Sequence, residues 1–155
     1  MIIEPQSDEH WMRHAIGLAK LAEANGEVPV GAVLVKDNAV IGEGFNQVIT
    51  LNDPTAHAEI LALRDATTLL KNYRLPETTL YITIEPCSMC AGAIVHARVK
   101  HLVFAANEPK AGAIVSQDCF LDREYLNHQT TYQGGVLRDE CAQLITKFFQ
   151  IKRQP

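Results

Sequence analysis

The first regular pattern of apolar and polar residues along the chain is that of an amphipathic helix. Ser7 and Asp8 are suited to its N-terminus, and Asn25-Gly26 is suited to its end. Between them the apolar residues recur every three or four positions, at Trp11, Met12, Ala15, Ile16, Ala19 and Ala22.

Two extended segments follow the helix and predict a β-hairpin. Residues 28–35 are rich in valine, and residues 39–45 resume the extended pattern. The polar turn Lys36-Asp37-Asn38 separates them.

A second helix is predicted from Pro54 to the region of Leu69. Asp53 offers a cap, and proline is favoured at the first helical position. His57 and Glu59 would then lie in its first two turns.

A strand, a helix and a second strand are predicted next. Residues 80–84 have the composition of a buried strand that ends at Glu85-Pro86, residues 87–97 are small and apolar, and residues 101–106 are again strand-like. Such a βαβ unit makes the two strands parallel, so the fold class is α/β.

The last third of the chain is less regular. Residues 107–130 show only short helical patches, and 131–137 predict a last strand interrupted by Gly134-Gly135. From Asp139 a helix is predicted, with one apolar face made by Cys141, Leu144, Ile145 and Phe148. We expect one domain over 1–155.

Composition restricts the class of protein. The chain has 155 residues, of which 47% are hydrophobic and 21% charged, which is enough for one substantial core. The acidic start lacks an apolar signal region, and no run approaches the roughly 18 apolar residues of a membrane span. We therefore expect a cytoplasmic protein, in which close cysteines bind metal or catalyse rather than form disulfides.

The net charge of −4 gives no overall field for binding nucleic acid. A local patch is possible near the C-terminus, where Lys147, Lys152 and Arg153 accompany Phe148-Phe149. The same residues are typical of an amphipathic helix with a solvated face, which is the interpretation that the sequence alone favours.

Three residues have the chemistry of zinc ligands. His57, Cys87 and Cys90 supply one imidazole and two thiolates, which leaves the fourth tetrahedral position for water. Glu59 is a spare carboxylate that can act as a general acid and base.

Helix geometry restricts how these residues can meet. Residues two apart are rotated by about 200° on a helix, so His57 and Glu59 can face one ion only near the helix N-terminus. Cys87 and Cys90 are three apart and share a face, just after Pro86. Two helix N-termini would thus converge on one ion and favour thiolates.

The segments His57-Ala58-Glu59 and Pro86-Cys87-Ser88-Met89-Cys90 resemble the signature of the zinc-dependent nucleobase deaminases. Within that superfamily the likeness is to bacterial tRNA adenosine deaminases, and it covers nearly the whole chain. Further matching segments are Gly26–Ala32, Gly42–Asn46, Asp53–Glu59, Glu85–Ala93 and Lys110–Ala113.

The resemblance implies a three-layer α/β/α fold of the cytidine deaminase type, with a mixed five-stranded sheet, one zinc ion per subunit and a homodimer. It implies hydrolysis of the wobble adenosine in the anticodon stem-loop of an arginine tRNA to inosine, with Glu59 moving the protons. The substrate-binding residues that it implies are Val28, Pro29, Asn46, Ala58, Glu108, Lys110 and Phe149. Glu108 stands where the family usually has an aspartate.

Two other functions fit the zinc residues. A deaminase of a free base or nucleotide, such as cytosine or guanine, would carry the same signature but would not need the Lys110 loop or a basic aromatic C-terminus. A zinc-stabilised binding module without catalysis would need a fourth protein ligand and would have no use for Glu59.

Overall fold

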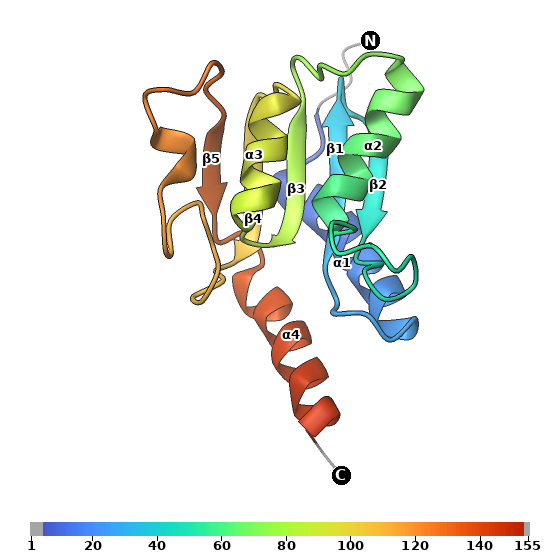
Figure 1. Cartoon of the computed structure of the whole chain (residues 1–155). Helices are drawn as coiled ribbons and strands as arrows, with labels where there is room; N and C mark the ends of the chain where they lie inside the picture. Colours follow the sequence, from blue (N-terminus) through green and yellow to red (C-terminus); the bar gives the residue numbers. More distant parts are fainter. Residues whose placement is uncertain (1–4, 154–155) are drawn as a thin grey trace.

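The computed structural model describes residues 5–153 and contains one five-stranded mixed sheet (Figure 1). The strands lie in the order β2-β1-β3-β4-β5. The pairs β1–β2 and β1–β3 are antiparallel, whereas β3–β4 and β4–β5 are parallel. This confirms the predicted hairpin, the parallel pair and the mixed sheet. The strand bounds are Gly31–Lys36 (β1), Ala39–Phe45 (β2), Thr79–Ile84 (β3), His101–Ala106 (β4) and Thr131–Gly134 (β5).

Helices cover both faces of the sheet and give the three layers that we expect. In Figure 1, α2 and α3 lie in front of the sheet, α1 lies behind it, and α4 extends from its lower edge. Within residues 5–153, no helix has the length and apolar character to cross a membrane. The helix bounds are Asp8–Ala24 (α1), Ala58–Leu70 (α2), Ser88–His96 (α3) and Arg138–Arg153 (α4), with a 3-10 turn at Phe120–Asp122 (η1).

Successive side chains of a strand point to opposite faces of the sheet. The central strands have apolar residues at successive positions, so both faces of the sheet are apolar. In β1, Leu34 packs under α2 and α3, and Val33 packs toward α1. Phe104 and Val103 of β4 divide between the two faces in the same way. Both cores are therefore continuous across the strands that carry the site.

The second helix starts later than predicted. Asp53 does not cap it; its Oδ1 accepts hydrogen bonds from the Thr55 N–H (2.9 Å) and the Thr55 hydroxyl (2.7 Å), which closes a tight turn. His57 is then extended, with φ −74° and ψ 154°, and α2 begins at Ala58 instead of Pro54. His57 is thus the N-cap residue of the helix.

Two predicted strands are shorter than their patterns suggest. The chain turns at Val28, whose carbonyl accepts a hydrogen bond from the Val30 N–H (2.8 Å), so β1 begins only at Gly31. At the other end of the sheet, β5 stops at Gly134. The next residue, Gly135, has a φ of +97° that favours glycine and turns the chain toward α4.

Glycines in β2 allow α2 to approach the sheet closely. A Cβ atom on Gly44 would lie 2.2 Å from the carbonyl oxygen of Ala58, and one on Gly42 would lie 2.4 Å from that of Ala62. Since Ala58 directly follows His57, the contact at Gly44 fixes the end of the helix that carries the predicted zinc ligand.

We predict that Gly44→Ala lowers the free energy of unfolding by about 1–3 kcal/mol, because the added methyl group overlaps main-chain atoms that cannot move independently. Chemical denaturation measures the change. Gly17→Ala is the matched control: Gly17 lies in α1 with nothing within 4 Å of its added Cβ, so this change should stabilise the helix by about 0.5–1 kcal/mol. Equal stability of the two variants would contradict the close-packing argument.

Candidate functional site

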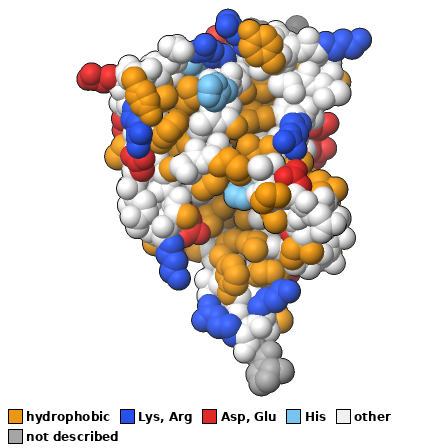
Figure 2. Space-filling model, in the orientation of Figure 1, with side chains coloured by type: hydrophobic (Ala, Val, Ile, Leu, Met, Phe, Trp, Pro, Cys, Tyr) orange, Lys and Arg blue, Asp and Glu red, His pale blue; other side chains and the backbone are white. Residues whose placement is uncertain are grey.

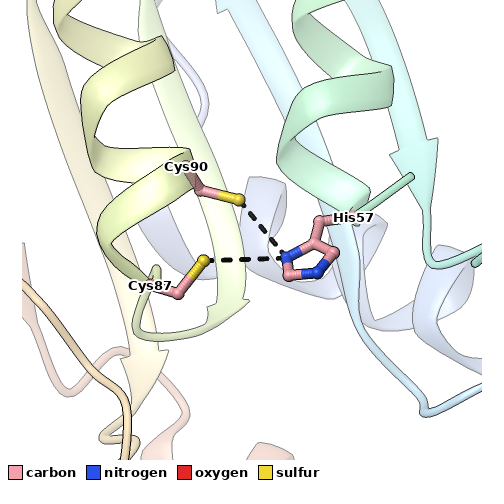
Figure 3. A group of neighbouring side chains, drawn as sticks. All are labelled: His57, Cys87 and Cys90. Atoms are coloured by element: carbon pink, nitrogen blue, oxygen red, sulfur yellow. Dashed lines mark hydrogen bonds between the residues drawn. The ribbon is translucent and has the colours of Figure 1, made fainter. Parts of the chain in front are cut away.

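Three predicted metal ligands lie together at the N-termini of α2 and α3 (Figure 3). The Nδ1 atom of His57 is 3.8 Å from the Cys87 sulfur and 3.4 Å from the Cys90 sulfur. All three ligand atoms lie within 4.8 Å of one another. His57 reaches the cluster from the N-cap of α2, and Cys87 from the N-cap of α3.

The donor set fits zinc. Bonds of about 2.3 Å to sulfur and about 2.1 Å to imidazole nitrogen separate neighbouring tetrahedral ligands by about 3.5–3.8 Å. The nitrogen-to-sulfur distances of 3.4 and 3.8 Å agree with that spacing. Among residues 5–153, no fourth histidine, cysteine or carboxylate joins the group. His57, Cys87 and Cys90 would therefore hold the ion and leave one position open.

Local electrostatics favour the thiolate form of Cys87. Hydrogen bonds donated by the Cys90 thiol and by His57 lower the pKa of Cys87 to about 4. Hydrogen bonding to Cys87 and burial raise the pKa of Cys90, and the pKa of His57 is raised mainly by its hydrogen bond to Cys87. The positive ends of α2 and α3 also point at this site. The surrounding groups thus stabilise one thiolate, on Cys87, while the Cys90 thiol donates to it.

Glu59 lies in the first turn of α2 beside the three ligands and is not one of them. Its side chain is only 3% exposed, yet it lines the pocket that His57 and Cys87 also line. Burial raises the pKa of Glu59 to about 7. A carboxyl group in this place can hold a proton close to the reacting atoms.

Asn46 follows β2 and is fixed by the start of α2. Its Oδ1 accepts a hydrogen bond from the Ala58 N–H (2.9 Å), one of the free amides of the first helical turn. This orients the side-chain amide, so that the amide nitrogen is the group left to meet a ligand. Asn46 is placed in the pocket as a consequence.

The pocket has a volume of ≈ 220 Å³ and opens beside the three ligands. Two of the predicted substrate-binding residues, Pro29 and Ala58, are buried and do not line it. Its lining consists of Val28, Val30, Asn46, His57, Glu59, Ile84, Glu85, Cys87, Glu108, Ala111, Ile145 and Phe149.

A second cavity of ≈ 390 Å³ shares Ile84, Glu108, Ile145 and Phe149 with the first. Lys110 lines this second cavity, so the structure brings it near the pocket without placing it against the ligands. The Glu108 carboxylate accepts a hydrogen bond from the Lys110 N–H (3.0 Å) and so binds within its own loop.

The basic aromatic C-terminus divides its residues between two environments. Phe148 is 9% exposed and lies under the Lys152 side chain, whose Nζ is 5.6 Å from the ring centre. Phe149 is 40% exposed and lines both cavities. The helix is thus amphipathic, as one interpretation expects, and it also presents an aromatic ring to the pocket.

Two buried acids that organise the loops around the pocket are not predicted from sequence patterns. Glu27 accepts hydrogen bonds from the N–H groups of Ile49 (3.2 Å) and Thr50 (2.7 Å), in the loop before α2. Glu85 binds main-chain N–H groups in the loop after β4. Their partners are more than twenty residues away, so no local pattern could identify them.

Comparison with known proteins agrees with this geometry. Residues 5–106 match the family model described as the cytidine and deoxycytidylate deaminase zinc-binding region. The tRNA-specific adenosine deaminase of Haemophilus influenzae is 52% identical over 153 residues, which cover 98% of this chain and 88% of that protein. The match and the donor set together show that the cluster is a zinc site with one ion per chain.

Solved structures extend the comparison. One, from a study of A-to-I editing by tRNA:A34 deaminases at the wobble position of transfer RNA, has a TM-score of 0.84 and 42% identity, covering 87% of this chain and 98% of that one. A guanine deaminase from Bacillus subtilis has a TM-score of 0.65 and 36% identity, covering 96% of this chain and 94% of that one. Proteins with different substrates therefore share this fold.

We predict that Cys87→Ser lowers zinc content and the free energy of unfolding together, the latter by more than about 2 kcal/mol, because ligand loss removes binding energy that stabilises the fold. Metal analysis and thermal denaturation measure the two changes. Cys119→Ser is the matched control, since Cys119 is exposed and outside the cluster and should leave both unchanged. Full zinc occupancy in Cys87→Ser would contradict the assignment.

Proposed function

The chain belongs to the cytidine and deoxycytidylate deaminase family, and we propose that it hydrolyses the wobble adenosine of a tRNA to inosine and ammonia. The observation that carries the proposal is the buried carboxyl group of Glu59, which shares a pocket with a three-ligand zinc site. A zinc-stabilised binding module has no use for that carboxyl group.

The protein groups have distinct tasks in this reaction. Zinc, when bound, makes a water molecule acidic enough to serve as the nucleophile. Glu59 would accept one proton of that water and deliver it to the ring nitrogen of adenine. It would then carry the second proton, from the hydroxyl group added to the ring carbon, to the amine, which leaves as ammonia when its C–N bond breaks. One water is consumed and one ammonia released, so Glu59 returns to its starting state.

The other residues of the pocket position the substrate. Asn46, held by the Ala58 N–H, donates its amide hydrogens to the nucleotide. Val28 forms an apolar wall for the base. Pro29 and Ala58 do not line the pocket, and they contribute through the position of the main chain behind it. An anticodon loop suits such a pocket, because its bases are already unpaired and cost little to turn outward.

Three observations favour RNA over a free base. The pocket adjoins a second cavity, which gives room for more than one nucleotide. Lys110 and Phe149 line that cavity and offer a cation and a stacking surface. The similarity to a tRNA-specific adenosine deaminase, at 52% identity, also exceeds the 36% found for a guanine deaminase.

We further propose the anticodon stem-loop of an arginine tRNA as the substrate, with Glu108, Lys110 and Phe149 contacting nucleotides beside the wobble position. We also propose the cytoplasm as the place of the reaction, because the proposed substrate is a tRNA. The single sheet and its two cores support the whole site, as expected if residues 1–155 act as one deaminase domain.

We also propose that the chain forms a homodimer through the outer face of α2 and α3. A groove of ≈ 400 Å³ lies between these helices and is lined by Ile60, Leu63 and Ala93 among others. Figure 2 shows hydrophobic side chains along the middle of this face. A second copy of the chain would remove this apolar surface from water.

The function is tested by incubating the zinc-loaded protein with four substrates in separate reactions. One is an anticodon stem-loop that carries a wobble adenosine, and the other three are free adenosine, free cytidine and guanine. We expect inosine from the stem-loop, and at least a hundredfold less from Glu59→Gln, because general acid and base catalysis contributes about 10²–10⁴-fold. Zinc content and thermal stability of the variant should match the parent.

Product from free nucleosides or guanine alone would overturn the RNA substrate. Unchanged turnover in Glu59→Gln would remove Glu59 from the mechanism.

The dimer is tested by sedimentation velocity. Ala93→Arg places a charged side chain in the groove and should convert the dimer to monomer. Ala24→Arg, at the exposed end of α1, is the control that should remain dimeric. A monomeric parent protein at micromolar concentration would refute the proposed interface.

A further inference from the structure

Glu85 is a buried acid with five hydrogen-bond donors and no cation. It is the last residue before Pro86-Cys87 and is 2% exposed. None of the ion pairs in residues 5–153 includes it. A buried carboxylate requires such compensation, and here main-chain and hydroxyl groups supply it.

All five donors come from one loop, which follows β4. Oε2 accepts from the N–H groups of Ile114 (3.0 Å), Val115 (2.8 Å) and Ser116 (2.9 Å). Oε1 accepts from the Glu108 N–H (3.0 Å) and from the Ser116 hydroxyl. Oε2 thus binds only the 114–116 end of the segment 108–116, whereas Oε1 links Glu108 to Ser116 and so joins its two ends.

The main chain of the loop also packs closely on the Glu85 carboxyl group. A Cβ atom on Gly112 would lie 2.3 Å from the Glu85 carboxyl carbon, so the main chain packs directly on it. The Ala113 N–H donates to the carbonyl of Pro86 (2.9 Å), which adds a main-chain link. The position of the loop is therefore tied to the residues next to the ligand Cys87.

The same loop carries side chains that face the two cavities. Glu108 and Ala111 line the pocket beside the ligands, and Lys110 lines the adjoining cavity. We propose that Glu85 is a positioning residue for RNA binding: it holds the 108–116 loop against the metal centre, so that Glu108 and Lys110 meet the nucleotides beside the target base. This proposal rests on the proposed function, because it assumes an RNA substrate.

Glutamine at position 85 gives a sharp test because it keeps the size but replaces one oxygen with an N–H donor. The amide oxygen can keep the three N–H groups of Ile114, Val115 and Ser116. The amide nitrogen then faces the Glu108 N–H, and two donors cannot form a hydrogen bond with each other. Glu85→Gln should therefore release the Glu108 end of the loop selectively, whereas Glu85→Ala should release both ends.

We expect hydrogen exchange at the Glu108 amide of zinc-loaded Glu85→Gln to be at least about tenfold faster than in the parent, with exchange at Val115 changed less. The KM for the anticodon stem-loop should rise by on the order of tenfold, with kcat reduced less and zinc content unchanged. Single-residue exchange by NMR and steady-state kinetics measure these effects.

Met12→Ala controls for lost stability, because Met12 is fully buried in α1 on the other face of the sheet. It should be less stable than the parent yet keep the parental KM and Glu108 exchange. Parental KM or parental Glu108 exchange in Glu85→Gln would overturn the proposal. If the parent protein makes no inosine, the proposed function fails, and exchange at Glu108 still decides whether Glu85 orders the loop.

Discussion

The separation between the first turns of α2 and α3 is the constraint on which the whole site depends. Each helix contributes its N-cap residue, and the Nδ1 of His57 lies 3.8 Å from the sulfur of Cys87. The sheet sets this distance, since α2 packs on β1 and β2, whereas α3 connects β3 to β4. The antiparallel pairing of β1 with β3 joins the two halves. A one-residue slip in that pairing would separate the ligands, so metal binding and strand register are linked.

Local patterns predict most of the fold and part of the site. Helical spacing and Ser7 identify α1, and the three candidate ligands follow from their residue types together with the helix starts predicted near them. The start of α2 is not predictable in this way, since the Asp53 carboxylate can either cap a helix or close a turn onto Thr55. Local patterns also cannot predict hydrogen bonds between residues that are distant in the sequence. Asn46 binds the Ala58 N–H, and Glu85 binds a loop up to 31 positions away.

An acidic chain can still bind a polyanion if some of its carboxylates near the pocket are buried and compensated by N–H donors. The sequence has 18 acidic and 14 basic residues. Near the pocket, however, Glu27 and Glu85 are buried and surrounded by N–H donors, and hydrogen bonding lowers the pKa of both against the opposing effect of burial. The main-chain N–H groups of the loops compensate the negative charges of these two carboxylates. Lys110 and Lys152 are exposed on the segments that border the cavities.

The way in which Glu85 holds its loop has a consequence for evolution. Four of its five partners are main-chain N–H groups, which every residue except proline provides. Apart from Gly112 and Ser116, the loop can therefore change its side chains without losing its anchor. Substitutions at 108, 110 and 111 would alter what the pocket recognises while the ligand geometry is inherited intact. Such a division allows one metal centre to serve diverging substrates within a lineage.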